Sequence, residues 1–283
     1  MVFVTSNTIL KLYDVYYMSP NAILISDVAY RFSTQDSSSP AILENASLSI
    51  PSGEFVSIVG PTGCGKSTLL NMVSGLLLPS SGVVTVFGKK VNSVQTCCGY
   101  MFQGEALLPW RTTAENIAFG LELRGVPKGE IDHHVRDWLA RVHLDKHADK
   151  FPHELSGGMR KRASLAQMFI TNPDILLMDE PFSALDVQTR NLMENQLLDI
   201  WTSDKKTVLF VTHDLEEAIA LSDRVILMQA GPRSKPVKEF VIDINRPRDV
   251  FEIRLTDDFI SIHREIWNAL RVEVQQSHRE AVA

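Results

Sequence analysis

The chain has 283 residues, 45% of them hydrophobic and 22% charged, which is typical of a soluble globular protein that buries a substantial core. Its formal net charge of −6 comes without a basic block, and this argues against nucleic acid as a partner because binding to a phosphate backbone usually leaves a basic footprint. The apolar runs are far shorter than the roughly 20 residues of a membrane-spanning helix, so any membrane role is expected to be peripheral.

The N-terminus and the cysteines indicate the compartment. Residues 1–22 lack clear periodicity and the pattern of a secretory signal, so we interpret them as a tail and expect a cytoplasmic protein. The cysteines are Cys64, Cys97 and Cys98. An odd number, with two adjacent, favours reduced thiols over a disulfide framework.

The predicted elements alternate between strands and helices. A β-branched stretch predicts a strand over Ile23–Phe32, and "FVSIVG" (55–60) predicts a second strand that leads through a glycine-rich loop into a helix. A third strand is expected between Gly82 and Gly88. From about 107 to 171 the pattern turns helical, and one predicted helix carries an apolar face made of Ile131, Val135, Trp138, Leu139 and Val142.

Two later apolar runs, "DILLMDE" and "TVLFVTHD", have the pattern of strands that are covered on both faces of a parallel sheet. Polar groups at the ends of such strands are where α/β folds bind their ligands. The segment Asp257–Val272 predicts an amphipathic helix.

The loop "GPTGCGKS" (60–67) matches the pattern G-x-x-x-x-G-K-[ST] between a predicted strand and a predicted helix. Its glycines let the backbone amides approach phosphate groups, and the helix dipole adds to the attraction. Lys66 is expected to meet the β- and γ-phosphates of a nucleotide, and the hydroxyl of Ser67 to ligate Mg²⁺. A chance match is the alternative, and the flanking strand and helix weigh against it.

Two adjacent carboxylates end the run "ILLMDE". Asp179 can hold Mg²⁺, directly or through water, and Glu180 can polarise an attacking water molecule. Taken alone, strand-end acids are more often helix caps or turn formers. After a phosphate-binding loop the functional interpretation is favoured.

Three further residues have a structural and a functional interpretation. Gln103 follows a strand-like run and could reach a metal and water, or it could be a surface glutamine. His213 ends "TVLFVTH" and could contact the γ-phosphate or orient the water, or it could serve only structure. Phe32 could stack on an adenine ring, or it could belong to the core.

A second glycine pair, in "LSGGMRKR" (155–162), precedes a basic helical stretch and has no ligand of its own in this chain. In chain order, "GPTGCGKST", a Gln after an apolar strand, "LSGGM", "LLMDEPFSALD" and "VTHD" resemble the ATP-binding subunits of ABC transporters over about residues 24–243. The motif "LSGG" is diagnostic because other P-loop ATPases lack it.

This resemblance implies an α/β fold: a P-loop NTPase with a RecA-like mixed sheet core, an antiparallel β subdomain and an inserted α-helical subdomain at about 104–172. The ATPase domain would span 23–245, and a C-terminal helical extension 246–283. The resemblance also implies a head-to-tail dimer of two copies that holds two ATP molecules with Mg²⁺.

The same resemblance assigns the site residues. Glu180 would be the catalytic carboxylate, His213 the switch histidine and Gln103 the Q-loop residue. Mg²⁺ would be held by Ser67, Gln103 and Asp179. The partner protomer would contact ATP through Ser156, Gly157, Gly158 and Asp186. The residues that bind ATP within the chain would be Phe32, Gly60, Pro61, Thr62, Gly63, Cys64, Gly65, Lys66, Ser67 and Thr68.

Departures from the usual pattern refine the resemblance. Met159 stands where most relatives have Gln, and "SGGMR" looks like the subgroup that energises import of nitrate, sulfonates, taurine and related solutes. The "RPR" at 246–248 with a helical tail is similar to that subgroup as well. Gln167 replaces an Arg found in many relatives, which affects a packing or charge contact and no catalytic position.

The resemblance implies ATP hydrolysis coupled to solute import at the cytoplasmic face of a bacterial inner membrane. Permease subunits would dock near Leu107, Leu108 and Trp110, for which core packing is the alternative, and a periplasmic solute-binding protein would take part indirectly. An exporter subunit and a soluble, non-transport ABC ATPase are the rival functions. The C-terminal helix could regulate, add dimer contacts or cover the sheet edge.

Overall fold

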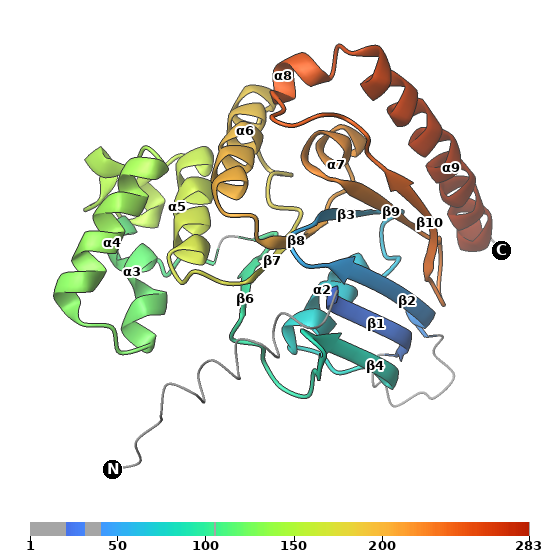
Figure 1. Cartoon of the computed structure of the whole chain (residues 1–283), viewed down its shortest axis with the longest axis horizontal. Helices are drawn as coiled ribbons and strands as arrows, with labels where there is room; N and C mark the ends of the chain where they lie inside the picture. The colour runs from blue at the N-terminus through green and yellow to red at the C-terminus, as the bar shows by residue number, and fades with distance from the viewer. Residues whose placement is uncertain (1–20, 32–40, 105, 283) are drawn as a thin grey trace.

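Two sheets organise the fold of the chain, for which a computed structural model describes residues 21–31, 41–104 and 106–282 (Figure 1). The antiparallel sheet has the strand order β2 (Leu43–Pro51), β1 (Asn21–Tyr30), β4 (Ser81–Val86) and β5 (Lys89–Lys90). The larger sheet has the order β10 (Pro236–Val241), β9 (Arg224–Met228), β3 (Phe55–Val59), β8 (Thr207–Val211), β7 (Ile175–Asp179) and β6 (Cys98–Met101). The predicted α/β class with a mixed sheet is confirmed.

Strands β3, β7 and β8 are buried along their whole length, which explains their continuous apolar sequences. Their neighbours pair in parallel from β9 to β6, while β10 pairs antiparallel to β9. The strand expected from residue 23 is β1. The strand expected between Gly82 and Gly88 is β4, which ends where Phe87 and Gly88 take positive φ angles in a turn to β5.

The α-helices are α2 (Lys66–Ser74), α3 (Thr113–Leu123), α4 (Lys128–Arg141), α5 (Gly157–Phe169), α6 (Val187–Ser203), α7 (Leu215–Leu221), α8 (Val250–Ile253) and α9 (Asp257–Val282). Two short 3₁₀ helices, η1 (Asp145–His147) and η2 (Pro152–Glu154), precede α5. In Figure 1, α3, α4 and α5 gather on one side of the larger sheet, and α2 lies beside the antiparallel sheet. No helix in the described part of the chain has the length and apolar character needed to cross a membrane.

The helical segment has its own small core. Ile131, Val135, Leu139 and Val142 are buried together with residues of α3 and α5, as their spacing predicts. Trp138 is partly buried and stacks on Phe169, with ring centroids 5.5 Å apart. This contact joins the helical segment to the main core.

The structure describes the predicted C-terminal helix but not most of the predicted N-terminal tail. Residues 1–20 of the expected tail lie outside the described residues, and residues 21 and 22 begin β1. The predicted helix Asp257–Val272 exists as α9 and continues to Val282. Its apolar residues Phe259, Ile266 and Leu270 enter the main core, and Glu265 pairs with Lys238 of the edge strand β10 at 2.9 Å. This packing agrees with the alternative in which the helix covers the sheet edge.

Arg248 connects the C-terminal extension to the main domain. The side chain is buried, and its guanidinium donates hydrogen bonds to five backbone carbonyls. They belong to Ile219, Ala220, Ser222, Ile242 and Ile244. Burial lowers the pKa of Arg248 to about 10, which leaves the group charged near neutral pH. The last residue of "RPR" is therefore a structural clamp.

We expect Arg248→Met to lower the free energy of unfolding by about 3 kcal/mol, because several buried carbonyls lose a charged donor at once. Denaturant unfolding of the full chain measures this change. Arg136→Met, at an exposed site on α4, is the matched control and should change the free energy by less than about 0.5 kcal/mol. Equal effects of the two substitutions would contradict the clamp.

Candidate functional site

The glycine-rich loop joins β3 to α2 and is held by hydrogen bonds from Lys66 to carbonyl oxygens at the start of the loop. Gly63 and Gly65 take left-handed φ angles of 82° and 89°, and a Cβ atom at Gly65 would lie 2.8 Å from Leu43. The buried ammonium of Lys66 donates to the carbonyl oxygens of Gly60 and Pro61 at 2.9 and 3.0 Å. The loop therefore presents a cation that is held by main-chain oxygens which phosphate oxygens can replace.

Cys64 lies in the same loop, and its side chain is buried in the core that the antiparallel sheet, α2 and the larger sheet form together. Burial raises the pKa of this thiol, with Lys66 opposing the effect. Only the backbone of Cys64 is thus placed to meet a phosphate. Phe32, the predicted adenine-stacking residue, lies outside the described residues.

Ser67 and Asp179 meet at the end of β7. The Ser67 hydroxyl donates to Asp179 Oδ1 at 3.0 Å. Burial raises the pKa of Asp179, and the bond from Ser67 partly offsets this. A hydroxyl and a buried carboxylate in contact fit Mg²⁺, which takes few protein oxygens and completes its shell with phosphate oxygens and water.

Glu180 contacts both of the other predicted catalytic residues. Gln103 Nε2 donates to Glu180 Oε2 at 3.0 Å, and His213 Nδ1 lies 3.2 Å from the same oxygen. Glu180 has a left-handed φ of 45°, an unusual conformation for a residue with a side chain, and its amide donates to the carbonyl of Val211. The structure therefore brings Gln103, Glu180 and His213 together. The side chain of Gln103, which was also predicted as a Mg²⁺ ligand, is hydrogen-bonded to Glu180.

The second glycine pair begins a helix. Ser156 caps α5 by accepting a hydrogen bond from the amide of Met159 at 3.3 Å, and Gly157 and Gly158 form the first turn. The first amides of a helix lack intrahelical partners and attract anions. Asp186 caps α6 in the same way by accepting a hydrogen bond from the amide of Thr189 at 3.0 Å. Contact of these residues with a second copy stays a prediction.

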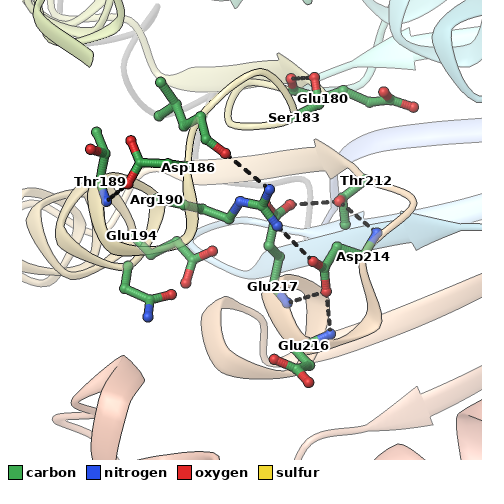
Figure 2. Close-up of polar contacts among 12 residues, drawn as sticks. Glu180, Ser183, Asp186, Thr189, Arg190, Glu194, Thr212, Asp214, Glu216 and Glu217 are labelled. Carbon is green, nitrogen blue, oxygen red and sulfur yellow. Dashed lines mark hydrogen bonds and ion pairs between the residues drawn. The ribbon is translucent and has the colours of Figure 1, made fainter. Parts of the chain in front are cut away.

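Sequence reasoning missed a partly buried charge network on α6 and α7. Arg190 of α6 pairs with Asp214, which caps α7 directly after His213, and with Glu217 in the first turn of α7 (Figure 2). Residues 212–214 are called the His213 loop below. Further along α6, the fully buried Glu194 accepts from Arg254 at 3.0 Å, while its other oxygen has no hydrogen-bond partner among the described residues. The stretch "DLEEA" carries a charge pattern that could have signalled the network, but its partners are distant in sequence.

The comparisons with known proteins agree with this geometry. The sequence profile of the ABC transporter family matches residues 43–183. An uncharacterised ABC transporter ATP-binding protein of Methanocaldococcus jannaschii is 44% identical over 236 residues, which cover 83% of this chain and 86% of that protein. The taurine import ATP-binding protein TauB of Rhizobium johnstonii is 42% identical, over 79% of this chain and 87% of that protein.

A third relative, the bicarbonate transport ATP-binding protein CmpD of Synechocystis, is 41% identical over 74% of each chain. Among solved structures, a dimeric ATP-binding cassette in a post-hydrolysis state, bound to ADP and Pi, superposes with a TM-score of 0.70 and 30% identity. The match covers 79% of this chain and all of that one. The fold and the site thus define a P-loop ATPase. The chain belongs to the ABC transporter family, and within it the chain is an ATP-binding subunit with ATPase activity.

The buried Glu194 predicts a pH dependence of stability. Burial raises the pKa of Glu194 to about 8 from an ordinary value of 4.5, Arg254 and Arg190 oppose the shift, and Glu217 and Asp214 add to it. Between these pH values the folded state holds a proton that the unfolded state has released, so stability falls as pH rises from about 5 to 8. We expect Glu194→Gln to flatten this dependence and to gain stability relative to the wild type as pH rises.

Denaturant unfolding of both proteins at several pH values between about 5 and 8 measures the difference. Glu252→Gln, at an exposed position on α8, is the control and should keep the wild-type slope. A stability difference between Glu194→Gln and wild type that stays constant over this range would contradict the predicted titration.

Proposed function

We propose that the chain energises an importer of a small solute at the cytoplasmic face of a bacterial inner membrane. The observation that carries the catalytic part is the meeting of Gln103 and His213 on Glu180, next to the Ser67–Asp179 pair and the phosphate-binding loop. Import is supported by two relatives about 40% identical, one named as a taurine import ATP-binding protein and the other as a bicarbonate transport ATP-binding protein.

In the proposed reaction, the loop amides of Gly60–Thr68 and Lys66 hold the ATP phosphates, and Lys66 exchanges its carbonyl partners for phosphate oxygens. Glu180 then polarises the attacking water, with His213 and Gln103 fixing the direction of its carboxylate. Ser67 and Asp179 would hold Mg²⁺, which neutralises phosphate charge when bound. Most of the catalysis is positioning and charge stabilisation.

A second copy of the chain would complete each site. The uncapped amides at the start of α5, with Ser156, Gly157 and Gly158, suit the γ-phosphate of ATP held by the partner's loop. Asp186 would approach the partner from the start of α6. The dimeric arrangement of the solved cassettes supports this head-to-tail assembly.

Permease subunits would dock beside the Gln103 segment. A groove of about 460 Å³ lies there between β6 and α3, lined by apolar groups that include Phe102, Leu108 and Leu123. Trp110 is 71% exposed and is available for docking, whereas Leu107 is buried in the helical core. The docking alternative therefore fits Trp110, and the core-packing alternative fits Leu107. A periplasmic solute-binding protein would deliver the solute to the permease.

The role of Glu180 can be tested directly. We expect the full-length Glu180→Gln variant to bind ATP, to hydrolyse it at least about a hundredfold more slowly and to accumulate as an ATP-bound dimer, because the amide cannot polarise water. Phosphate release and size-exclusion chromatography with ATP measure these outcomes. Glu130→Gln, exposed on α4, is the control. Hydrolysis at the wild-type rate would remove Glu180 from its proposed role.

Import can be tested in the cells that make the protein. Lys66→Ala removes the cation from the phosphate-binding loop, so we expect it to abolish uptake of one labelled solute among taurine, nitrate, a sulfonate and bicarbonate. Lys128→Ala, exposed at the start of α4, should leave that uptake unchanged. Normal uptake of all these solutes together with loss of export of another compound would contradict import and favour an exporter.

A further inference from the structure

Both neighbours of His213 are fixed by hydrogen bonds. The buried Thr212 donates from Oγ1 to Glu217 Oε2 at 2.6 Å, and its oxygen accepts from the amide of Asp214 at 3.0 Å. Asp214 caps α7 by accepting from the amides of Glu216 and Glu217 at 2.8 and 3.3 Å. The backbone on either side of His213 is therefore tied to the start of α7.

The imidazole itself has few constraints. His213 is 61% exposed, and one side of it borders a cavity of about 530 Å³ between α6, α7 and α9. Packing on that side does not hold the ring against Glu180. Its direction depends on the backbone conformation that Thr212 and Asp214 set.

Arg190 joins this loop to the segment before α6, as Figure 2 shows. Its Nη1 contacts Asp214 Oδ2 at 2.9 Å, and its Nε lies 3.6 Å from Glu217 Oε1. Its Nη2 donates to the carbonyl of Leu185 at 3.2 Å. Leu185 directly precedes Asp186 in the segment 180–186, which we call the Asp186 segment. One guanidinium therefore holds the Asp186 segment and the His213 loop at once.

Arginine is required for this arrangement. The planar guanidinium donates hydrogen bonds to Asp214 and to the carbonyl of Leu185 and forms an ion pair with Glu217, whereas a lysine ammonium is a single flexible point charge that cannot span these three groups together. The same segment is also tied to the backbone of Glu180, since the Ser183 hydroxyl donates to the main-chain carbonyl of Glu180 at 3.1 Å.

We propose that Arg190 is a positioning residue for ATP hydrolysis: it couples the placement of the Asp186 segment to the contact between His213 and Glu180. When a second copy contacts Asp186, the resulting displacement of the Asp186 segment is passed through Leu185 and Arg190 to Asp214. The backbone of His213 moves with Asp214. This inference rests on the proposed catalytic roles of Glu180 and His213. A merely structural Arg190, which only balances the buried Glu217, is the competing account.

A double-mutant cycle on the full chain with ATP and Mg²⁺ separates these accounts. We expect Arg190→Lys to lower kcat about tenfold while KM for ATP changes less than about twofold, because the charge stays and the geometry is lost. In the His213→Ala background, Arg190→Lys should cause no further loss, since it acts through that residue. An equal loss of kcat in both backgrounds would overturn the inference.

Arg224→Lys is the matched control. Arg224 also forms ion pairs with two carboxylates, those of Glu54 and Glu239, but it lies at the start of β9. We expect it to leave kcat unchanged. A tenfold loss for Arg224→Lys as well would show a general effect of lost ion pairs and overturn the positioning role.

A second pair of variants avoids changing the buried charges. Thr212→Val removes the hydroxyl that links Glu217 and Asp214, whereas Thr212→Ser keeps it. We expect a lower kcat for the valine variant and rescue by serine, and a normal kcat for valine would contradict the network. The single variant His213→Ala tests the proposed function separately: a wild-type rate there would remove His213 from catalysis, whereas additive losses with Arg190→Lys would remove only the coupling.

Discussion

The parallel register of β3, β8, β7 and β6 is the constraint on which the rest of the site depends. Val211 pairs with both Ile58 and Asp179, and Met178 pairs with Met101. The next one or two residues of each strand therefore leave the sheet at the same edge, and they are Gly60, His213, Glu180 and Gln103. A slip of one residue in a fully buried strand would exchange its two faces, so the cores on both sides fix the geometry of the site.

This edge also concentrates charge in a poorly solvated place. Asp179 has a raised pKa because it is buried, and each neighbouring buried charge has a partner that limits this cost: Ser67 for Asp179, main-chain oxygens for Lys66, and Arg190 for Glu217. Removing one member of such a pair costs more than the pair itself contributes. The polar groups are thus held in fixed positions, which favours electrostatic catalysis because little reorganisation is needed when charge develops.

The sequence was sufficient wherever one local motif fixes a backbone conformation. The phosphate-binding loop and the buried strands before Asp179 and His213 followed from such motifs, whereas the mixed sheet followed from the family resemblance, and these predictions were confirmed. The network of Arg190 was not predicted, because Leu185, Arg190 and Asp214 meet only once α6 and α7 pack side by side. For the same reason the alternatives for Leu107 and Trp110 stayed open: adjacent apolar residues enter or leave the helical core according to the path of a loop, which periodicity does not specify.

Within one chain, the site satisfies its own polar groups: Lys66 is bound to carbonyls, and Gln103 is bound to Glu180. In the proposed reaction a nucleotide replaces the first of these contacts. The sheet beneath is densely packed and does not deform continuously, so in the proposed dimer a signal from the second copy would travel through the short segments between strands and helices. Two such segments, at 180–186 and 212–214, meet at the guanidinium of Arg190. The surface at Asp186, where the proposed second copy makes contact, and the carboxylate of Glu180, which we propose acts on water, are therefore separated by only a few hydrogen bonds.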